Sequence, residues 1–132
     1  MIVVSVIVAI GAVMFARHAK YQSEIKAFGG PELIGSGIPV LLELGSYSCM
    51  PCKAMVPILS ELRTEYAGSL GISFIDVWKD PSAGKKYDVN SIPTQVFFDS
   101  SGKELFRHVG FFGKEDILAK WKDLGINLKK AK

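Results

Sequence analysis

The pattern of apolar and polar residues predicts one long apolar segment followed by a compact α/β region. Residues 2–16 are apolar except for Ser5 and Gly11, and the basic residues Arg17 and Lys20 follow at once. This run is short for a complete membrane span, which needs about 17–25 residues, and it lacks the basic start and the cleavage site of a secretory signal. Our preferred interpretation is a single N-terminal membrane anchor, with a signal-like segment or a buried core helix as the alternatives.

The pattern then alternates between strand-like and helix-like stretches. Residues 40–44 are apolar apart from Glu43, as expected for a central strand that is covered on both faces. A helical pattern follows over residues 50–67, where Pro57 should introduce a kink and Gly68 should end the helix. The elements expected after it are strand 72–77, a short helix or turn over 80–87, strands 95–98 and 103–109, and helix 114–124. This order predicts an α/β fold with a mixed four-stranded sheet and helices on both faces.

Composition and charge support a division into four parts. Residues 1–20 form the anchor or signal-like segment, the glycine-rich residues 21–38 a linker, residues 39–125 the domain and residues 126–132 a basic tail. The formal net charge is +3, which equals the charge of the three lysines in that tail. The rest of the chain is therefore neutral on balance, so no nucleic-acid partner is expected.

The two cysteines of the chain lie close together, at Cys49 and Cys52, where the strand pattern gives way to the helical one. A helix start stabilises a thiolate, and the short spacing allows a disulfide to open and close without unfolding, so a dithiol–disulfide exchange site is expected. A purely structural role for this disulfide is not expected, because a bridge that closes so short a loop adds little stability. No metal site is expected, because His18 and His108 lack ligand-type spacing to the cysteines.

The order of elements, the cysteine motif at 49–53 and the Ile-Pro-Thr sequence at 92–94 together resemble the thioredoxin family over residues 39–124. Pro57 lies where that family kinks its active-site helix. The glycines and the aromatic residue of the closing hairpin also match, at Gly102, Phe106 and Gly110.

The chain departs from this family at three places. Ser48 stands where thioredoxin has tryptophan, Glu43 stands where it has a buried aspartate, and residues 21–38 show no clear counterpart of its first strand. These departures resemble membrane-tethered, extracytoplasmic members of the family, which implies an extracytoplasmic domain. Arg17 and Lys20 favour the cytoplasmic side by the positive-inside rule, so both orientations stay open.

The resemblance implies roles for four residues. Cys49 is expected to be the attacking nucleophile, with a pKa lowered into the range of about 3.5–7.5, and Cys52 to be the more buried, resolving thiol. Glu43 is expected to accept the proton of Cys52 through water, the alternative being a side chain that points to solvent. Pro93 is expected to follow a cis peptide bond, the alternative being an ordinary trans turn proline.

The same resemblance implies an apolar surface on which an extended polypeptide docks. The backbone of Ile92 is expected to pair with a substrate strand. Phe111 has a second interpretation as a core residue. The residues expected to form this surface are Met50, Pro51, Ile92, Gly110 and Phe111.

These features favour a membrane-anchored thiol–disulfide oxidoreductase that acts mainly as a reductase of protein disulfides. Its cysteine pair would need no cofactor, and a thiol-based electron donor in the membrane would reduce it again. One alternative is a Cu(I) metallochaperone that binds through the two thiolates. Another is a docking module of the same fold in which the cysteines have no role.

Overall fold

The structure, a computed structural model, describes residues 2–132 and contains every strand and helix expected in the α/β region. The observed boundaries lie within two residues of the expected ones, because the apolar periodicity marks the buried part of each element. The observed elements are α1 (Ile2–Lys26), the 3-10 helix η1 (Pro31–Leu33), β1 (Val40–Gly45), α2 (Met50–Glu65), β2 (Gly71–Asp76), α3 (Pro81–Lys86), β3 (Thr94–Phe98), β4 (Glu104–Val109) and α4 (Lys114–Asp123).

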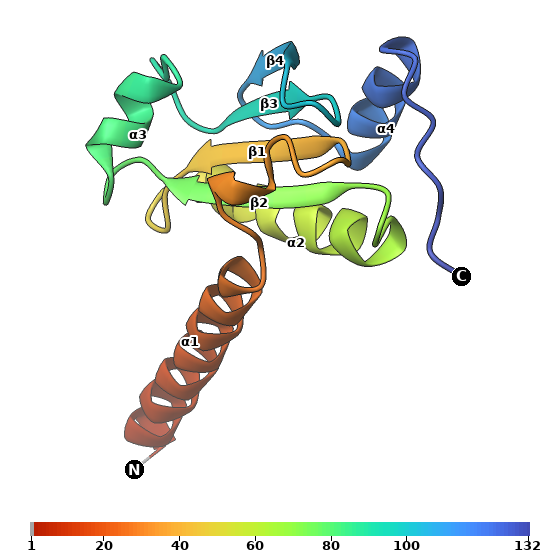
Figure 1. Ribbon diagram of the computed structural model, residues 1–132. Coiled ribbons are helices and arrows are strands. Elements are labelled where there is room, and N and C mark those ends of the chain that lie inside the picture. The colour runs from red at the N-terminus through yellow and green to blue at the C-terminus, as the bar shows by residue number, and fades with distance from the viewer. Residues whose placement is uncertain (1) are drawn as a thin grey trace.

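The strands form one mixed sheet in the order β2-β1-β3-β4 (Figure 1). Strand β1 is parallel to β2 and antiparallel to β3, which is in turn antiparallel to β4. All six residues of β1 are buried, as the apolar pattern of a central strand requires. The expected mixed four-stranded sheet is confirmed.

Each face of the sheet has its own apolar core. On one face Leu41 and Phe97 pack with Leu59 of α2 and with Trp121 of α4. On the other face the alternate strand residues pack beneath the segments before β1 and after α3, and Ala83 of α3 is buried. The strand residues of this second core are Val40, Leu42, Leu44, Val96 and Phe98. Because side chains of a strand alternate between faces, β1 contributes to both cores.

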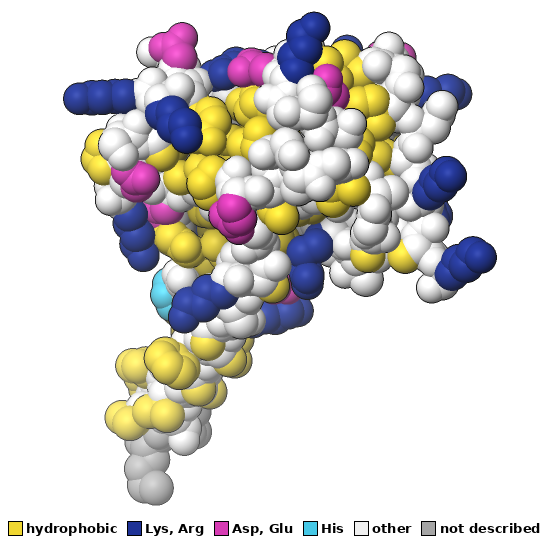
Figure 2. Space-filling view, viewed as in Figure 1, with side chains coloured by type: hydrophobic (Ala, Val, Ile, Leu, Met, Phe, Trp, Pro, Cys, Tyr) yellow, Lys and Arg dark blue, Asp and Glu magenta, His cyan; other side chains and the backbone are white. Residues whose placement is uncertain are grey.

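Helix α1 extends away from the domain (Figure 1), and Figure 2 shows hydrophobic side chains along its outer part and basic side chains where it meets the domain. Residues Val3–Lys26 have the length and composition of a helix that crosses a membrane, and the most apolar window of this stretch is not buried by the domain. The same properties fit a signal sequence.

The last turn of α1 packs against the domain. The helix continues to Lys26, and Ile25 and Phe28 are only 4% and 8% exposed because they join the core between the sheet and α2. Gly29 then pairs with β2, as its N–H donates to the carbonyl of Ile72 and its carbonyl accepts from Phe74. This single bridge lies within residues 21–38, where the sequence showed no clear counterpart of the first strand of thioredoxin. The division at residue 20 stays a prediction, since a helix can continue beyond a bilayer.

Candidate active site

The two cysteines lie at the start of α2 and form a disulfide, with their Cα atoms 5.2 Å apart. Cys49 is the N-cap residue of α2, and its sulfur accepts a hydrogen bond from the backbone N–H of Cys52 at 3.3 Å. Pro51 occupies the first turn, where the missing N–H of proline costs no helical hydrogen bond. Cys49 is 7% exposed and Cys52 is fully buried, so a partner can approach the first sulfur more easily than the second.

Glu43 lies in the buried middle of β1 and its side chain is fully enclosed. It shares a face of the strand with Leu41 and Gly45. Gly45 lies directly beside the second cysteine, because a Cβ atom built there would come within 3.1 Å of the Cys52 sulfur. The carboxyl group therefore belongs to the next residue on the same strand face, two positions from Gly45, which lies beside the resolving sulfur. The alternative in which Glu43 points to solvent is wrong.

The environment of Glu43 favours the protonated form of its carboxyl group at neutral pH. Burial raises its pKa to about 8, because an ionised carboxylate loses its hydration there, while the hydrogen bond from Gln95 lowers the pKa in part. Gln95 Nε2 donates to Glu43 Oε2 at 3.0 Å, and the second carboxyl oxygen, Oε1, has no partner among residues 2–132.

Gln95 is a site residue that the sequence analysis missed. It is fully buried and lies directly opposite Glu43 in the β1–β3 pairing, and His108 lies opposite Gln95 in the β3–β4 pairing. The imidazole of His108 stacks on the Phe112 ring at 4.0 Å. The sequence did contain a signal, because Gln95 is a polar residue within the strand-like run at 94–98. Its pairing with Glu43 depends on the register of the strands, which the sequence does not show.

The peptide bond between Ile92 and Pro93 is cis, as expected from the resemblance. The carbonyl of Pro93 accepts a hydrogen bond from the N–H of Gly110 at 2.7 Å, which brings the loop after β4 beside this turn. Within the part of the chain that the structure describes, the N–H and carbonyl groups of Ile92 make no hydrogen bond. This backbone is therefore free to pair with another chain.

Exposed apolar side chains gather on these loops. Outside α1, the large hydrophobic side chains that are exposed in residues 27–132 all lie on the loops and element ends beside the cysteines and Pro93. Of the five residues expected to form the docking surface, Met50, Pro51 and Phe111 are exposed, and Ile92 and Gly110 are half-buried. The large hydrophobic side chains and their exposed fractions are Met50 at 72%, Trp78 at 60%, Val109 at 56% and Phe111 at 54%.

Asp76, at the end of β2, is a second residue that the sequence analysis missed. Its Oδ2 accepts from the N–H of Tyr47 at 2.9 Å, and its Oδ1 accepts from the N–H groups of Trp78 and Lys79, each at 3.0 Å. This one carboxylate therefore holds the loop before Cys49 against the loop after β2. An aspartate directly after a strand often caps a turn in this way, and that was the available signal.

Among residues 2–132, no group of three or more His, Cys, Asp or Glu side chains is placed to hold a metal ion. The cysteine pair offers two sulfurs, already joined to each other in this structure. The arrangement therefore fits thiol–disulfide exchange, and the metallochaperone alternative is not favoured.

Comparisons with known proteins agree with this chemistry. A family model described as Thioredoxin matches residues 13–123. The chain is 35% identical to a thioredoxin of Mycobacterium bovis over 97 residues, which cover 74% of this chain and 83% of that protein. It is 38% identical to a thioredoxin of Staphylococcus aureus over 84 residues, which cover 64% of this chain and 79% of that protein.

The fold is also found among solved structures. One described as "Structure of a malarial protein" superposes with a TM-score of 0.61 at 22% sequence identity, covering 65% of this chain and 96% of that one. At this level of identity the likeness shows the shared fold alone.

Proposed function

This chain belongs to the thioredoxin family and is a protein thiol–disulfide oxidoreductase, and from this premise we propose that it reduces protein disulfides with Cys49 as its nucleophile. The observation that carries the proposal is the position of Cys49 at the N-cap of α2. There the helix dipole and the N–H of Cys52 both stabilise negative charge on the sulfur. The cysteine pair needs no cofactor in this scheme.

The reaction proceeds in two exchange steps. In the first, the Cys49 thiolate attacks one sulfur of the substrate disulfide, whose bond breaks, and the departing substrate thiolate takes a proton. In the second, Cys52 loses its proton and attacks the Cys49 sulfur, which releases the other substrate thiolate. The substrate gains two electrons, and the enzyme is left with the Cys49–Cys52 disulfide seen in the structure.

Glu43 serves this cycle as the proton acceptor of Cys52. Its position on the same strand face as Gly45, which touches the Cys52 sulfur, supports transfer through one intervening water. With a pKa of about 8, only a minor fraction of the carboxyl groups is ionised near neutral pH, and it is this ionised form that takes up the proton and returns it when the disulfide is reduced again.

The substrate is an extended polypeptide that pairs with Ile92. The free N–H and carbonyl groups of Ile92 support this placement, because a strand can add to an unpaired backbone. Met50, Pro51 and Phe111, which are exposed, supply apolar surface beside it, and Gly110 lies next to Phe111.

We further propose that α1 anchors the protein in a membrane, with the domain on the extracytoplasmic side and a membrane thiol carrier as its electron donor. The apolar composition of Val3–Lys26 supports the anchor. Arg17 and Lys20 argue for the opposite orientation. Fusion of alkaline phosphatase to the C-terminus tests the side: activity of the fusion supports this orientation, and an inactive fusion places the domain in the cytoplasm.

The reductase proposal is tested by insulin reduction with dithiothreitol as the electron source. Cys49→Ser should abolish the activity, whereas Ala54→Ser, an exposed change on the same helix, should leave it intact. Activity that survives in Cys49→Ser would show that the nucleophile is assigned wrongly. A Cys52→Ala variant should trap substrates as mixed disulfides, which identifies them.

A further inference from the structure

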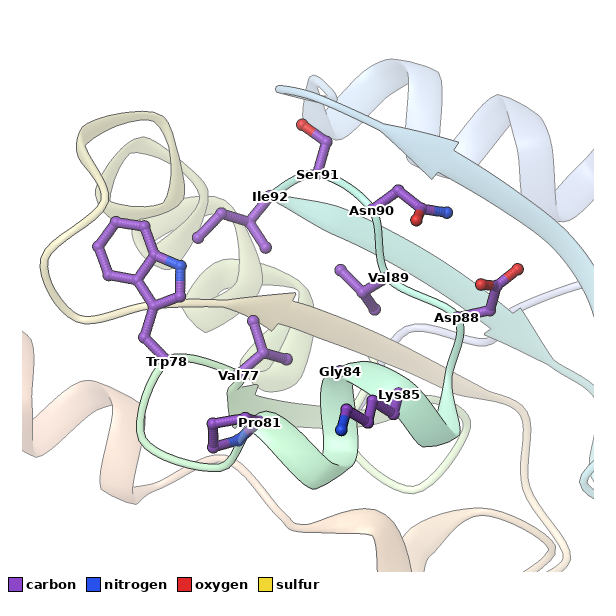
Figure 3. Close-up of a pocket in the computed structure, with 10 residues that line it drawn as sticks. All are labelled: Val77, Trp78, Pro81, Gly84, Lys85, Asp88, Val89, Asn90, Ser91 and Ile92. Carbon is purple, nitrogen blue, oxygen red and sulfur yellow. The ribbon is translucent and has the colours of Figure 1, made fainter.

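A cavity of about 460 Å³ lies beside the cis-proline turn, between α3 and the segment that leads into β3 (Figure 3). The cavity is open to solvent. Its apolar lining includes Val77, Trp78, Val89 and Ile92, and its polar lining is Lys85, Asp88, Asn90 and Ser91. Pockets of about 300–1,000 Å³ hold drug-sized ligands. The cavity is therefore large enough for one large side chain, and its apolar part is available to contact it.

Trp78 is the unusual part of this lining. Its side chain is 60% exposed, although burial of an indole is one of the larger apolar gains available to a protein. In Figure 3 the indole lies at the cavity on the side of the loop that precedes α2. An aromatic wall left open to solvent in this way is available to a partner.

The backbone of Trp78 is held close to the loop that carries the cysteines. The two oxygens of the Asp76 carboxylate accept from the backbone of Trp78 at 3.0 Å and from the backbone of Tyr47 at 2.9 Å. Tyr47 lies two residues before Cys49, so a single buried side chain ties the backbone of Trp78 to the active-site loop. The residue between Tyr47 and Cys49 is Ser48, so no aromatic side chain directly precedes Cys49.

Ile92, whose backbone is free to pair with a substrate, forms the part of the wall next to Trp78 (Figure 3). Successive side chains of a paired strand point to opposite sides. A polypeptide paired at Ile92 can therefore direct a side chain near its reactive cysteine into the cavity. The opposite charges of Lys85 and Asp88 offset each other, so the lining favours an uncharged occupant.

We propose that this cavity is a specificity pocket that takes a large apolar side chain, such as phenylalanine, from a position close to the reactive cysteine of the substrate polypeptide, with Trp78 as its main wall. This inference rests on the proposed reduction of protein disulfides. Trp78 is a specificity-determining residue in it and takes no part in the exchange of sulfur bonds.

The test compares two series of peptide disulfides that differ in the residues flanking the cysteine, with phenylalanine in one series and serine in the other. The wild type should reduce the phenylalanine series with the higher kcat/KM. Trp78→Ala should lower that preference about tenfold through a higher KM, since truncating an aromatic contact residue commonly costs that much. Trp78→Phe should retain most of the preference, and reduction of a small aromatic disulfide shows that the cysteine pair still reacts.

A second readout uses fluorescence. The chain has two tryptophans, of which Trp121 is 1% exposed and Trp78 is 60% exposed. In the Cys49→Ser, Cys52→Ser protein, adding a phenylalanine peptide should shift and strengthen the emission of Trp78, and a serine peptide should change it far less.

The outcomes separate the two proposals. An equal preference in wild type and Trp78→Ala, with no change in emission, would overturn the pocket and leave the reductase in place. Failure of the wild type to reduce either peptide series would overturn the reductase itself, and the pocket with it.

Discussion

Glu43 is a carboxyl group enclosed in the interior with one hydrogen-bond partner, and its protonation links folding to pH. Burial raises its pKa from 4.5 to about 8 in the folded protein. Below about pH 4.5 the group is protonated in both the folded and the unfolded chain. As the pH rises from there towards 8, the unfolded chain releases a proton that the folded protein keeps, so this contribution to stability is lost over that range.

We therefore expect Glu43→Gln to flatten the pH dependence of stability in the oxidised protein. Wild type should lose on the order of 4 kcal/mol relative to this variant between pH 4.5 and 8, because the pKa differs between the folded and unfolded chain and one pKa unit corresponds to about 1.4 kcal/mol. Urea denaturation of both proteins across this range measures the difference. A constant difference at every pH would show that the carboxyl group titrates normally.

The same variant should slow the catalytic cycle. Glutamine cannot take up the proton of Cys52, and a positioned proton acceptor commonly contributes about a hundredfold or more. We expect release of product from the mixed disulfide to slow by that order, with formation of the mixed disulfide affected less. Stopped-flow kinetics with a peptide disulfide separate the two steps, and equal slowing of both would argue for a merely structural role of Glu43.

Asp76 holds two loops with one carboxylate, so Asp76→Asn should disturb both. An amide offers one accepting oxygen in place of two, and we expect a loss of about 1–3 kcal/mol in unfolding free energy together with a higher KM for protein substrates. Asp99→Asn is the control, because Asp99 also caps a turn but accepts from the N–H groups of Ser101 and Lys103 through one oxygen, Oδ1, which asparagine can replace. The control should lose less stability than Asp76→Asn and keep its KM, as measured by denaturation and insulin reduction.

At the scale of elements, the sequence predicted the positions of helices and strands, because these follow from the local periodicity of apolar residues. The apolar run at 40–44 and the helical pattern from residue 50 were sufficient to place the cysteines between a strand and a helix. The partners of Glu43 and Tyr47 could not be predicted, because Gln95 and Asp76 are brought there by strand pairing and loop geometry. The resemblance to thioredoxin indicated the buried carboxyl group of Glu43, but it did not indicate Gln95, which hydrogen-bonds to it.

The end of α1 shows a different limit of prediction. Tyr21, Ile25 and Phe28 follow a helical spacing that faces the domain, but the polar residues among them and the glycines after them favoured a linker. A stripe of three residues is too short to indicate packing by itself. The structure nevertheless buries two of them almost completely.

This packing predicts where the chain can be shortened. A protein that begins at Tyr21 should keep the stability of the domain, whereas one that begins at Pro31 should lose about 3–5 kcal/mol, because the core then lacks Ile25 and Phe28. Ile25→Ala should reproduce part of this loss and Lys26→Ala, an exposed neighbour, should not. Thermal denaturation measures all four proteins, and equal stability of the two shortened chains would contradict the packing.

At the scale of the whole molecule, α1 is joined to the domain through its packed last turn, so in the proposed role of a membrane anchor it should orient the domain on a bilayer. The helix is about 37 Å long at 1.5 Å per residue, which exceeds a hydrocarbon core of about 30 Å. Lys53, directly after Cys52, lines a cavity shared with Met14 and Phe15 of α1, and its ammonium group lies 5.9 Å from the centre of the Tyr21 ring. The start of α2 is therefore close to the level at which the apolar part of α1 ends.

With α1 in a bilayer as proposed, we expect the redox site to lie at the membrane surface. A fluorophore on Cys49 in a Cys52→Ser protein should be quenched by lipids that carry a nitroxide on the headgroup. Eight glycine and serine residues inserted after Lys20 should relieve the quenching, because a flexible link removes the fixed orientation. The same insertion should leave the reduction of soluble insulin unchanged, since it touches no residue of the site. Quenching that is weak before the insertion, or equally strong after it, would show that α1 does not set the position of the domain.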